Sequence, residues 1–167
     1  MEYFDVYDEN ANKLNRIVAR AEYKEKLNHG EYIITPLCLV LNAKNEILIT
    51  KRALDKKGGG LWEPTKGGLR SGETPEDGMK RELVEEIGLA NSDDIKLVDK
   101  IILKQIIHLI YMLKADIDVT DLKFVDGEVI DAKFVTPEEF GRMADDGELN
   151  KKEMKMLLKS YEKGLKL

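Results

Sequence analysis

The sequence predicts an α/β fold, and three observations support this prediction. Residues 32–41 (YIITPLCLVL) form a nearly continuous apolar run with β-branched side chains, which is typical of a strand covered on both faces. A charged segment that starts at Pro75 carries apolar residues at helical spacing. Residues 137–166 show helix patterns again, after further strand patterns. Strand and helix patterns that alternate in this way indicate the α/β class.

The first predicted elements are a hairpin and a buried strand. Residues 1–20 place Asp-Glu-Asn-Ala-Asn between two strand-like pieces, which predicts a hairpin. In the apolar run at 32–41, Pro36 indicates a sheet edge or a bulge, because proline has no N–H to donate to a neighbouring strand. After the turn NAKN, residues 46–52 (EILITKR) predict the next strand.

The central helix has a signal at each end. Thr74 and Asp77 form a variant of the capping box, and Pro75 takes the first helical position. Gly88 lies where a helix often ends in a left-handed residue. The buried face is predicted from apolar residues that recur every four positions: Met79, Leu83 and Ile87.

The second half of the chain predicts further strands and two helices. Residues 95–103 and 106–115 indicate two strands, although the sequence does not place the break between them, and residues 128–135 indicate another. Within 137–166, the first helix is expected to be capped by Thr136. The second helix carries an apolar stripe at helical spacing: Met154, Leu157, Leu158, Tyr161 and Leu165.

Length and composition limit the class of protein. The 167 residues show no repeat and no linker, so we expect a single domain, 1–167. The most apolar stretch, 101–113, is too short and too interrupted by polar residues to cross a membrane, and the acidic N-terminus lacks the pattern of a secretion signal. The one cysteine, Cys38, lies in an apolar run and is expected in the core. We therefore expect a cytoplasmic protein without a membrane partner.

The charge is unevenly distributed along the chain. The net charge is −5, but residues 51–70 carry six basic and two acidic residues, or +4, which leaves −9 for the rest. An acidic protein is not expected to bind nucleic acid through its whole surface. The basic, glycine-rich stretch would suit a small anion, although a solvated loop explains it as well.

Three glutamates lie on one side of the central helix. Glu82, Glu85 and Glu86 are spaced i, i+3, i+4, where like charges repel by about a few tenths of a kcal/mol per pair. Without a metal ion we expect these carboxylates to face one another with nothing between them. A divalent cation such as Mg²⁺, which takes oxygen ligands, would turn the repulsion into binding. Taken alone, the pattern is also that of a solvated acidic face.

The surroundings of these glutamates resemble a known motif. Residues 67–89 begin with glycine, continue after five residues with Glu73, and after seven more with RELVEEIGL, which fills every position of the Nudix box. The chain therefore resembles the Nudix hydrolase family, and the order of elements over 32–150 is similar as well. The hairpin at 1–20 resembles the start of Nudix proteins related to isopentenyl-diphosphate isomerase.

The resemblance implies a fold and a reaction. The fold would be an α/β/α sandwich with a mixed central β-sheet. The reaction would be hydrolysis of a pyrophosphate bond in a nucleoside diphosphate linked to another moiety, by attack of water on phosphorus, with Mg²⁺ or Mn²⁺. The implied metal ligands are Glu82, Glu85, Glu86 and a backbone carbonyl at Gly67 or Gly68. Arg81 and Glu73 would pair to hold the loop on the helix.

The general base and the substrate contacts are less defined. Glu82 and Glu128 are both candidates for the base, and Glu128 would otherwise be a further metal ligand or a surface residue beside a turn. The basic stretch offers contacts to the phosphates and one aromatic ring for a base: Lys51, Arg52, Lys66, Arg70 and Trp62. For Trp62 a place in the core is the alternative.

Two other functions remain open at this stage. A nucleotide-sensing Nudix module without turnover is disfavoured because the box glutamates are intact. An isopentenyl-diphosphate isomerase-like activity is disfavoured because Cys38 lies in an apolar strand and not in a polar motif. The sequence does not identify the group joined to the nucleoside diphosphate, and it leaves open whether the chain forms a homodimer.

Overall fold

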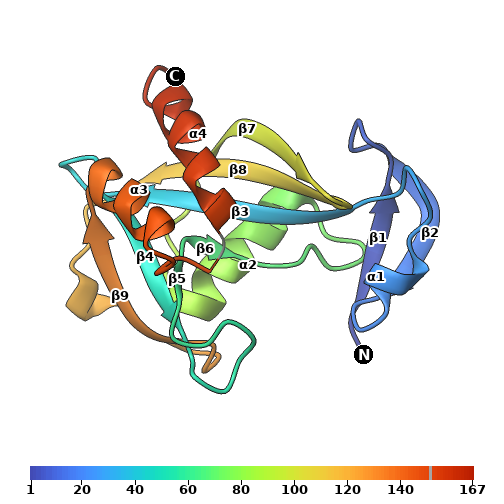
Figure 1. Ribbon diagram of the computed structural model, residues 1–167, viewed down its shortest axis with the longest axis horizontal. Helices are drawn as coiled ribbons and strands as arrows, with labels where there is room; N and C mark the ends of the chain where they lie inside the picture. Colours follow the sequence, from blue (N-terminus) through green and yellow to red (C-terminus); the bar gives the residue numbers. More distant parts are fainter. Residues whose placement is uncertain (151) are drawn as a thin grey trace.

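A mixed β-sheet lies between two layers of helices (Figure 1) in the computed structural model, which describes residues 1–150 and 152–167. Strands β3 (Ile33–Leu41) and β8 (Ile106–Lys114) pair in parallel at its centre. The other strands pair antiparallel with them or with each other: β4 (Ile47–Arg52), β5 (Trp62–Glu63), β6 (Thr65–Lys66), β7 (Lys96–Leu103) and β9 (Val129–Val135). The predicted α/β fold with a mixed sheet is confirmed.

Strand β3 is buried on both faces, as its apolar sequence predicts. Leu37, Leu39 and Leu41 pack with residues of α3 (Pro137–Asp145) and α4 (Leu157–Gly164). Ile34, Cys38 and Val40 alternate with them and pack against α2 (Pro75–Ile87). Burial raises the pKa of the Cys38 thiol, and this cysteine is a core residue.

The prediction that Pro36 marks a sheet edge or a bulge is wrong. Pro36 lies opposite Leu109 in an unbroken register between the two central strands. Its carbonyl accepts a hydrogen bond from the Gly67 N–H on the other side of β3, at 3.2 Å. In a strand, the N–H and C=O groups of one residue point to the same side. The nitrogen of Pro36 therefore faces the irregular segment after β6, and its lack of a hydrogen costs no hydrogen bond to β8.

Strands β3 and β4 separate soon after they begin to pair. They are in register only at Leu41 and Ile47, and farther along β6 pairs with β3 while β5 pairs with β4. The segment 62–66 therefore fills the gap between the two strands. This gap leads into the loop 67–74 and then into α2, so the sheet places the basic stretch beside the helix that carries the three glutamates.

Helix α2 begins and ends at the predicted residues. The Thr74 hydroxyl accepts a hydrogen bond from the Asp77 N–H at 3.1 Å, and Gly88 ends the helix with a φ of 69°. The apolar residues expected on the inner face, Met79, Leu83 and Ile87, are fully buried. The local signals are sufficient here because each acts within one turn of the helix.

The N-terminal hairpin is a separate two-stranded sheet at one end of the molecule, on the right in Figure 1. Its strands are β1 (Tyr3–Tyr7) and β2 (Lys13–Ala19), followed by the short helix α1 (Tyr23–Lys26). Phe4, Val6 and Val18 form a small core with Ile33 of the main sheet.

Three details of the second half differ from the sequence prediction or complete it. The break between β7 and β8 is a tight turn at Lys104, which has a φ of 55°. The second C-terminal helix begins as a 3₁₀ turn, Lys152–Met156, and α4 ends at Gly164. Leu165 therefore lies beyond the helix and is 39% exposed, so it does not continue the buried stripe. A 3₁₀ turn at Val119–Asp121 was not predicted.

No helix within the described residues is both long and apolar enough for a membrane span.

Asp5 attaches the hairpin to the loop 67–74. Its carboxylate is 2% exposed, accepts hydrogen bonds from the Ser71 hydroxyl (2.8 Å) and the Gly72 N–H (2.9 Å), and lies 2.7 Å from the Lys13 ammonium. Burial alone would raise the pKa of Asp5, but the ammonium and the two loop donors bring it below its ordinary value.

Asp5→Asn is expected to lower the free energy of unfolding by about 1–3 kcal/mol near neutral pH, because a buried charged acceptor is lost. A carboxylate with a lowered folded pKa stabilises above its ordinary pKa of 3.8, and this contribution is lost as the pH falls through the folded pKa. Denaturant unfolding of both proteins across the acid range should show the difference shrinking below about pH 4. A difference that stays constant with pH would contradict this role.

Candidate active site

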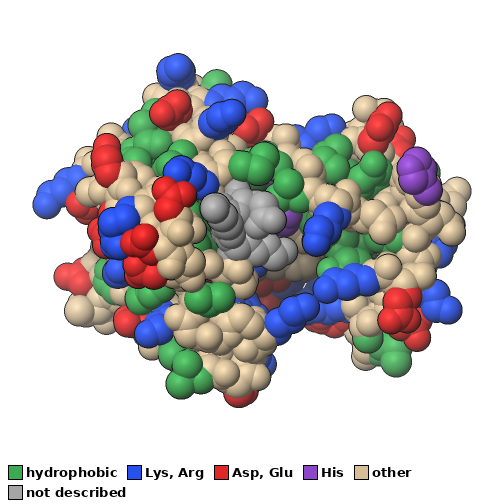
Figure 2. Space-filling model, viewed as in Figure 1, with side chains coloured by type: hydrophobic (Ala, Val, Ile, Leu, Met, Phe, Trp, Pro, Cys, Tyr) green, Lys and Arg blue, Asp and Glu red, His purple; other side chains and the backbone are tan. Residues whose placement is uncertain are grey.

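A polar cleft of about 610 Å³ lies between the main sheet and the N-terminal hairpin. Its basic lining residues are Arg20, Lys24, Arg52, Lys57, Lys66 and Arg70. Its acidic lining residues are Glu2, Glu82, Glu85, Asp126 and Glu128. Figure 2 shows Lys and Arg side chains on both sides of this hollow and acidic side chains deeper inside it. The cleft therefore combines cations for an anionic ligand with carboxylates for a cation.

Glu86 is the most deeply buried of the three helix glutamates. It is 3% exposed, and its Oε2 has no hydrogen-bond partner within the described part of the chain. Burial raises its pKa well above the ordinary value, and the neighbouring carboxylates of Glu82 and Glu63 raise it further. Burial also raises the pKa of Glu82, against the lowering effect of Arg81. An unpaired buried carboxylate is costly unless a cation joins it.

The expectation that nothing lies between the glutamates is wrong. The Arg81 guanidinium bridges two of them, with Nη1 at 2.5 Å from Glu82 and 3.0 Å from Glu85. Arg81 and Glu85 are four residues apart and share a face of the helix, whereas Glu82 is the next residue after Arg81 and is reached by the length of the arginine side chain. Within the described part of the chain, this arginine forms no hydrogen bond or ion pair with Glu86.

Arg81 also holds the loop 67–74 against the helix. Its Nε and Nη2 donate to the two oxygens of Glu73 at 2.6 and 2.9 Å, and Nη2 donates to the Gly68 carbonyl at 3.1 Å. Glu73 in turn accepts from the Arg70 N–H. Hydrogen bonding to Arg81 lowers the pKa of Glu73. The Arg81–Glu73 pair thus fixes the loop relative to α2.

Gly67 leaves the space that the Glu82 carboxylate takes. A Cβ atom at this position would lie only 1.9 Å from the carboxyl carbon of Glu82. No side chain larger than hydrogen therefore fits while Glu82 keeps its place. The backbone of Gly67 and the carboxylate of Glu82 therefore lie next to each other, and both residues line the cleft.

The acidic residues fit a divalent metal by their chemistry. Carboxylate oxygens are the ligands that Mg²⁺ and Mn²⁺ prefer, and the unpartnered Glu86 oxygen is a free ligand atom in a buried position. Within the described residues, no three acidic, His or Cys side chains already stand together as a metal site. Glu82 and Glu85 are engaged by Arg81 instead, so these two carboxylates would have to exchange one cation for another.

Glu63 is a site residue that the sequence analysis did not single out. It is 2% exposed and lies at 2.6 Å from Arg52 and 2.7 Å from the Lys66 ammonium. It also accepts a hydrogen bond from the Asn150 side chain. Burial would raise the pKa of Glu63, but these three partners bring it below the ordinary value. All three partners line the cleft, so one buried carboxylate positions its basic wall. The only sequence signal was an acidic residue inside a basic stretch.

The structure separates the basic and aromatic residues expected at the substrate. Arg52, Lys66 and Arg70 line the cleft, whereas Lys51 and Trp62 do not. The ammonium groups of Lys51 and Lys133 lie 5.6 and 5.0 Å from the centre of the Trp62 ring, which is partly buried against the core. Glu128 lies on the cleft rim, 4.0 Å from the Lys56 ammonium.

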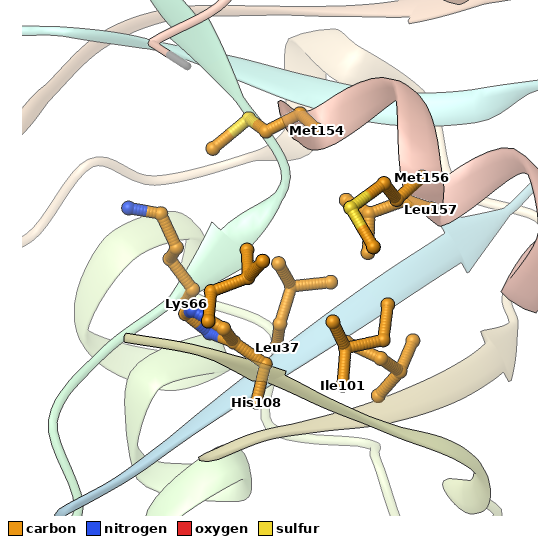
Figure 3. Close-up of a pocket in the computed structure, with 9 residues that line it drawn as sticks. Leu37, Lys66, Ile101, His108, Met154, Met156 and Leu157 are labelled. Atoms are coloured by element: carbon orange, nitrogen blue, oxygen red, sulfur yellow. The ribbon is translucent and has the colours of Figure 1, made fainter. Parts of the chain in front are cut away.

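A small apolar pocket of about 40 Å³ adjoins the cleft at Lys66 (Figure 3). Met154 and Met156 enclose it from the C-terminal segment, and Leu37 and His108 belong to strands β3 and β8 below them. The stem of Lys66 lines this pocket while its ammonium pairs with Glu63.

Gly67→Ala is expected to lower the activity of this site by about 10- to 100-fold, the usual effect of displacing a supporting group. The melting midpoint should change little, because the displaced Glu82 carboxylate ends a flexible side chain. Gly141→Ala is the control: its Cβ would also press on the end of a side chain, Leu158 of α4 at 3.3 Å, but Gly141 does not line the cleft. A Gly67→Ala protein with full activity would contradict the assignment.

Comparisons with known proteins agree with this geometry. A sequence model of the NUDIX domain matches residues 32–158. An uncharacterised Nudix hydrolase of Listeria monocytogenes is 30% identical over 152 residues, which cover 89% of this chain and 88% of the relative.

Solved structures share the fold at low sequence identity. Protein DR0079 of Deinococcus radiodurans superposes with a TM-score of 0.78 at 18% identity, over 95% of this chain and 98% of that chain. The NUDIX domain of NrtR from Shewanella oneidensis, solved in complex with ADP ribose, superposes with a TM-score of 0.62 at 14% identity. That match covers 89% of this chain and 99% of that one. At such identities the two structures support the fold alone.

Proposed function

We propose, from the premise that this chain belongs to the Nudix hydrolase family, that it hydrolyses a pyrophosphate bond in a nucleoside diphosphate linked to another moiety. The observation that carries the proposal is the buried Glu86, whose Oε2 has no hydrogen-bond partner within the described residues. Glu86 does not itself line the cleft, but its neighbours on α2, Glu82 and Glu85, do, and the charge of Glu82 acts on it. A buried carboxylate of this kind suits a divalent cation, and the basic walls suit the phosphates of a substrate.

The proposed roles follow from position. Glu82, Glu85 and Glu86 would hold Mg²⁺ or Mn²⁺, with the backbone carbonyl of Gly67 or Gly68 as a further ligand. Such an ion, when bound, lowers the pKa of coordinated water and neutralises charge on phosphate. Glu73 and Arg81 keep the loop and the helix in register around these ligands.

The substrate phosphates are assigned to the basic residues that line the cleft: Arg52, Lys66 and Arg70. Arg52 and Lys66 are both fixed by Glu63, so their charges are positioned before a substrate arrives. Lys51 and Trp62 lie outside the cleft lining, and we assign them no direct phosphate contact. The apolar pocket beside Lys66 would take an uncharged part of the substrate.

We propose Glu82 as the general base, because its carboxylate lines the cleft directly beside the backbone of Gly67, within the group of glutamates that would hold the metal. Glu128, half-exposed on the rim, would then be a minor contact. Turnover by Glu128→Gln within a few-fold of wild type is expected. A loss of about 10²- to 10⁴-fold would transfer the role of base to Glu128.

A substrate panel tests the proposal. The purified protein is incubated with Mg²⁺ and with ADP-ribose, dinucleoside polyphosphates, nucleotide sugars and NADH, and release of phosphorylated products is followed. ADP-ribose belongs in the panel because the fold is shared with a domain solved in complex with it. Turnover of at least one member, lost on removal of metal, is expected. Tight binding of a member without any product would instead indicate a nucleotide-sensing module.

An isomerase reaction that depends on a cysteine receives no support from the site. Cys38 is fully buried on the face of β3 toward α2, and burial raises the pKa of its thiol. It is not among the residues that line the cleft. A thiol in this place is neither reachable nor ionised near neutral pH.

A further inference from the structure

The N-terminal hairpin precedes residues 32–158, which match the family, yet it forms one wall of the cleft. The hairpin contributes Glu2 before β1 and Arg20 directly after β2, and the short helix α1 that follows contributes Tyr23 and Lys24. The opposite wall carries Arg52 and Lys66, and basic side chains therefore face each other across the hollow in Figure 2. The site is built from two parts of the chain.

The hairpin wall is fixed to the loop that supports the glutamates. The Ser71 N–H donates to the Tyr3 carbonyl at 2.7 Å, next to the two bonds that Asp5 accepts from the same loop. The Phe4 ring lies so close to Gly68 that a Cβ atom there would approach it to 2.7 Å. Backbone and side-chain contacts thus set the distance between the hairpin and the carboxylates, as expected of a binding surface and not of a loose extension.

The cleft is larger than the scissile group requires. Its volume of about 610 Å³ lies in the range of pockets that hold whole nucleotide-sized ligands. A second hollow of about 370 Å³ adjoins it and shares Gly68, Thr35 and Lys24 with it. The space therefore continues from the glutamates past Gly68 and along the hairpin.

The charges of the hairpin wall favour an anion. Glu2 lies 2.5 Å from Arg20 and 2.9 Å from Arg70, so one carboxylate is shared by two guanidinium groups. Lys24, with its ammonium 5.9 Å from the centre of the Tyr23 ring, adds a further cation on the same side. Arg20 and Lys24 also line the second hollow, whereas Arg52 and Lys66 do not. The positive charge of the hairpin wall is therefore separate from that of Arg52 and Lys66, which are paired with Glu63.

We propose that this wall is a second anion subsite, which binds a phosphate group of the substrate beyond the pyrophosphate bond that is cleaved. The inference rests on the proposed hydrolase function and narrows its substrate class to compounds with a further phosphate, either in the same chain or on the group joined to it. Lys24 is the main contact and Arg20 a secondary one, because Arg20 is already paired with Glu2.

The test compares the binding of inorganic pyrophosphate and tripolyphosphate, with Mg²⁺ in excess over both, by titration calorimetry at fixed ionic strength. Wild type should bind tripolyphosphate more tightly. Lys24→Ala should weaken tripolyphosphate binding about tenfold, as expected for one charged contact, and leave pyrophosphate within about twofold. Lys24→Arg should retain the preference. Lys26→Ala is the matched control, since it removes the same charge from the same short helix outside the cleft lining.

The subsite would be overturned if Lys24→Ala and Lys26→Ala weakened tripolyphosphate binding equally, or if Lys24→Ala weakened the binding of both anions equally. Either result would mean that the hairpin acts only through its overall positive charge. So would equal binding of the two anions by wild type. The substrate panel is scored separately. If Lys24→Ala selectively loses tripolyphosphate binding but no panel member is turned over, the subsite is supported and the hydrolase function is contradicted. If a panel member is turned over but the loss is not selective, the hydrolase function is supported and the subsite is contradicted.

Discussion

Glu86→Gln is expected to reduce turnover by about 10²- to 10³-fold, the usual cost of removing one group that stabilises charge in the reaction. The same change should raise the metal-free free energy of unfolding by about 1 kcal/mol, because an amide is easier to bury than a carboxylate whose pKa is already raised by its surroundings. The increase in melting midpoint that Mg²⁺ gives the wild type should shrink in the variant.

Melting curves with and without Mg²⁺, measured beside turnover, separate this outcome from a structural role. Glu76→Gln is the control, because Glu76 lies on the same helix with an exposed side chain that pairs with Lys80, and it does not line the cleft. If Glu86 served stability alone, Glu86→Gln would melt lower, respond to Mg²⁺ like the wild type and retain its activity.

Glu85 is expected to behave differently from Glu86. It lies 3.0 Å from Arg81 and 3.4 Å from Arg70, so Glu85→Gln removes favourable ion pairs and should not gain stability. From its spacing alone, relief of repulsion would have been expected at both positions. The distinction comes from Arg81, whose guanidinium lies between two of the carboxylates.

Arg81→Ala is expected to have the largest effect on stability, a loss of about 3 kcal/mol or more. The change leaves Glu73, Glu82 and Glu85 without their shared partner in a partly buried site, and uncompensated buried charges are costly. Arg81→Lys should recover only part of the loss, because an ammonium group cannot reproduce the two parallel bonds to Glu73. Turnover should fall in both variants as the loop 67–74 loses its attachment.

Denaturant unfolding and turnover together measure this role. Lys80→Ala, at the neighbouring position, removes only exposed ion pairs and should leave both quantities nearly unchanged. Similar unfolding curves for Arg81→Ala and Lys80→Ala would show that Arg81 is not the residue that holds the loop to the helix.

Local signals in the sequence predicted much of the fold. Thr74 and Gly88 act within one turn of α2, and the alternation of Leu37, Cys38 and Leu39 is a property of one strand, so each could be interpreted without its partners. Pro36 was misinterpreted because the side of β3 that its missing donor would face depends on how β6 and the following loop pack.

The parts of the site that were missed are non-local. Glu63 accepts a hydrogen bond from Asn150, 87 positions later in the chain. The hairpin contacts the loop 67–74 through Asp5 and Ser71, which are 66 positions apart. No periodicity connects such residues. The family motif predicted the acidic side of the cleft. The role of Glu63 behind the basic side, and the hairpin wall opposite, follow only from the packing of the chain.

We propose above that water attacks phosphorus at this cleft in a reaction that requires a divalent metal. The most direct test of this proposal is turnover of an active panel substrate in water enriched in ¹⁸O, with Mg²⁺ and after its removal by a chelator, with the products analysed by mass spectrometry. We predict one ¹⁸O atom in one phosphorylated product of each cleavage, formed by the wild type with Mg²⁺ and largely lost in Glu86→Gln. Products without ¹⁸O, or the same rate after removal of the metal, would contradict the claim.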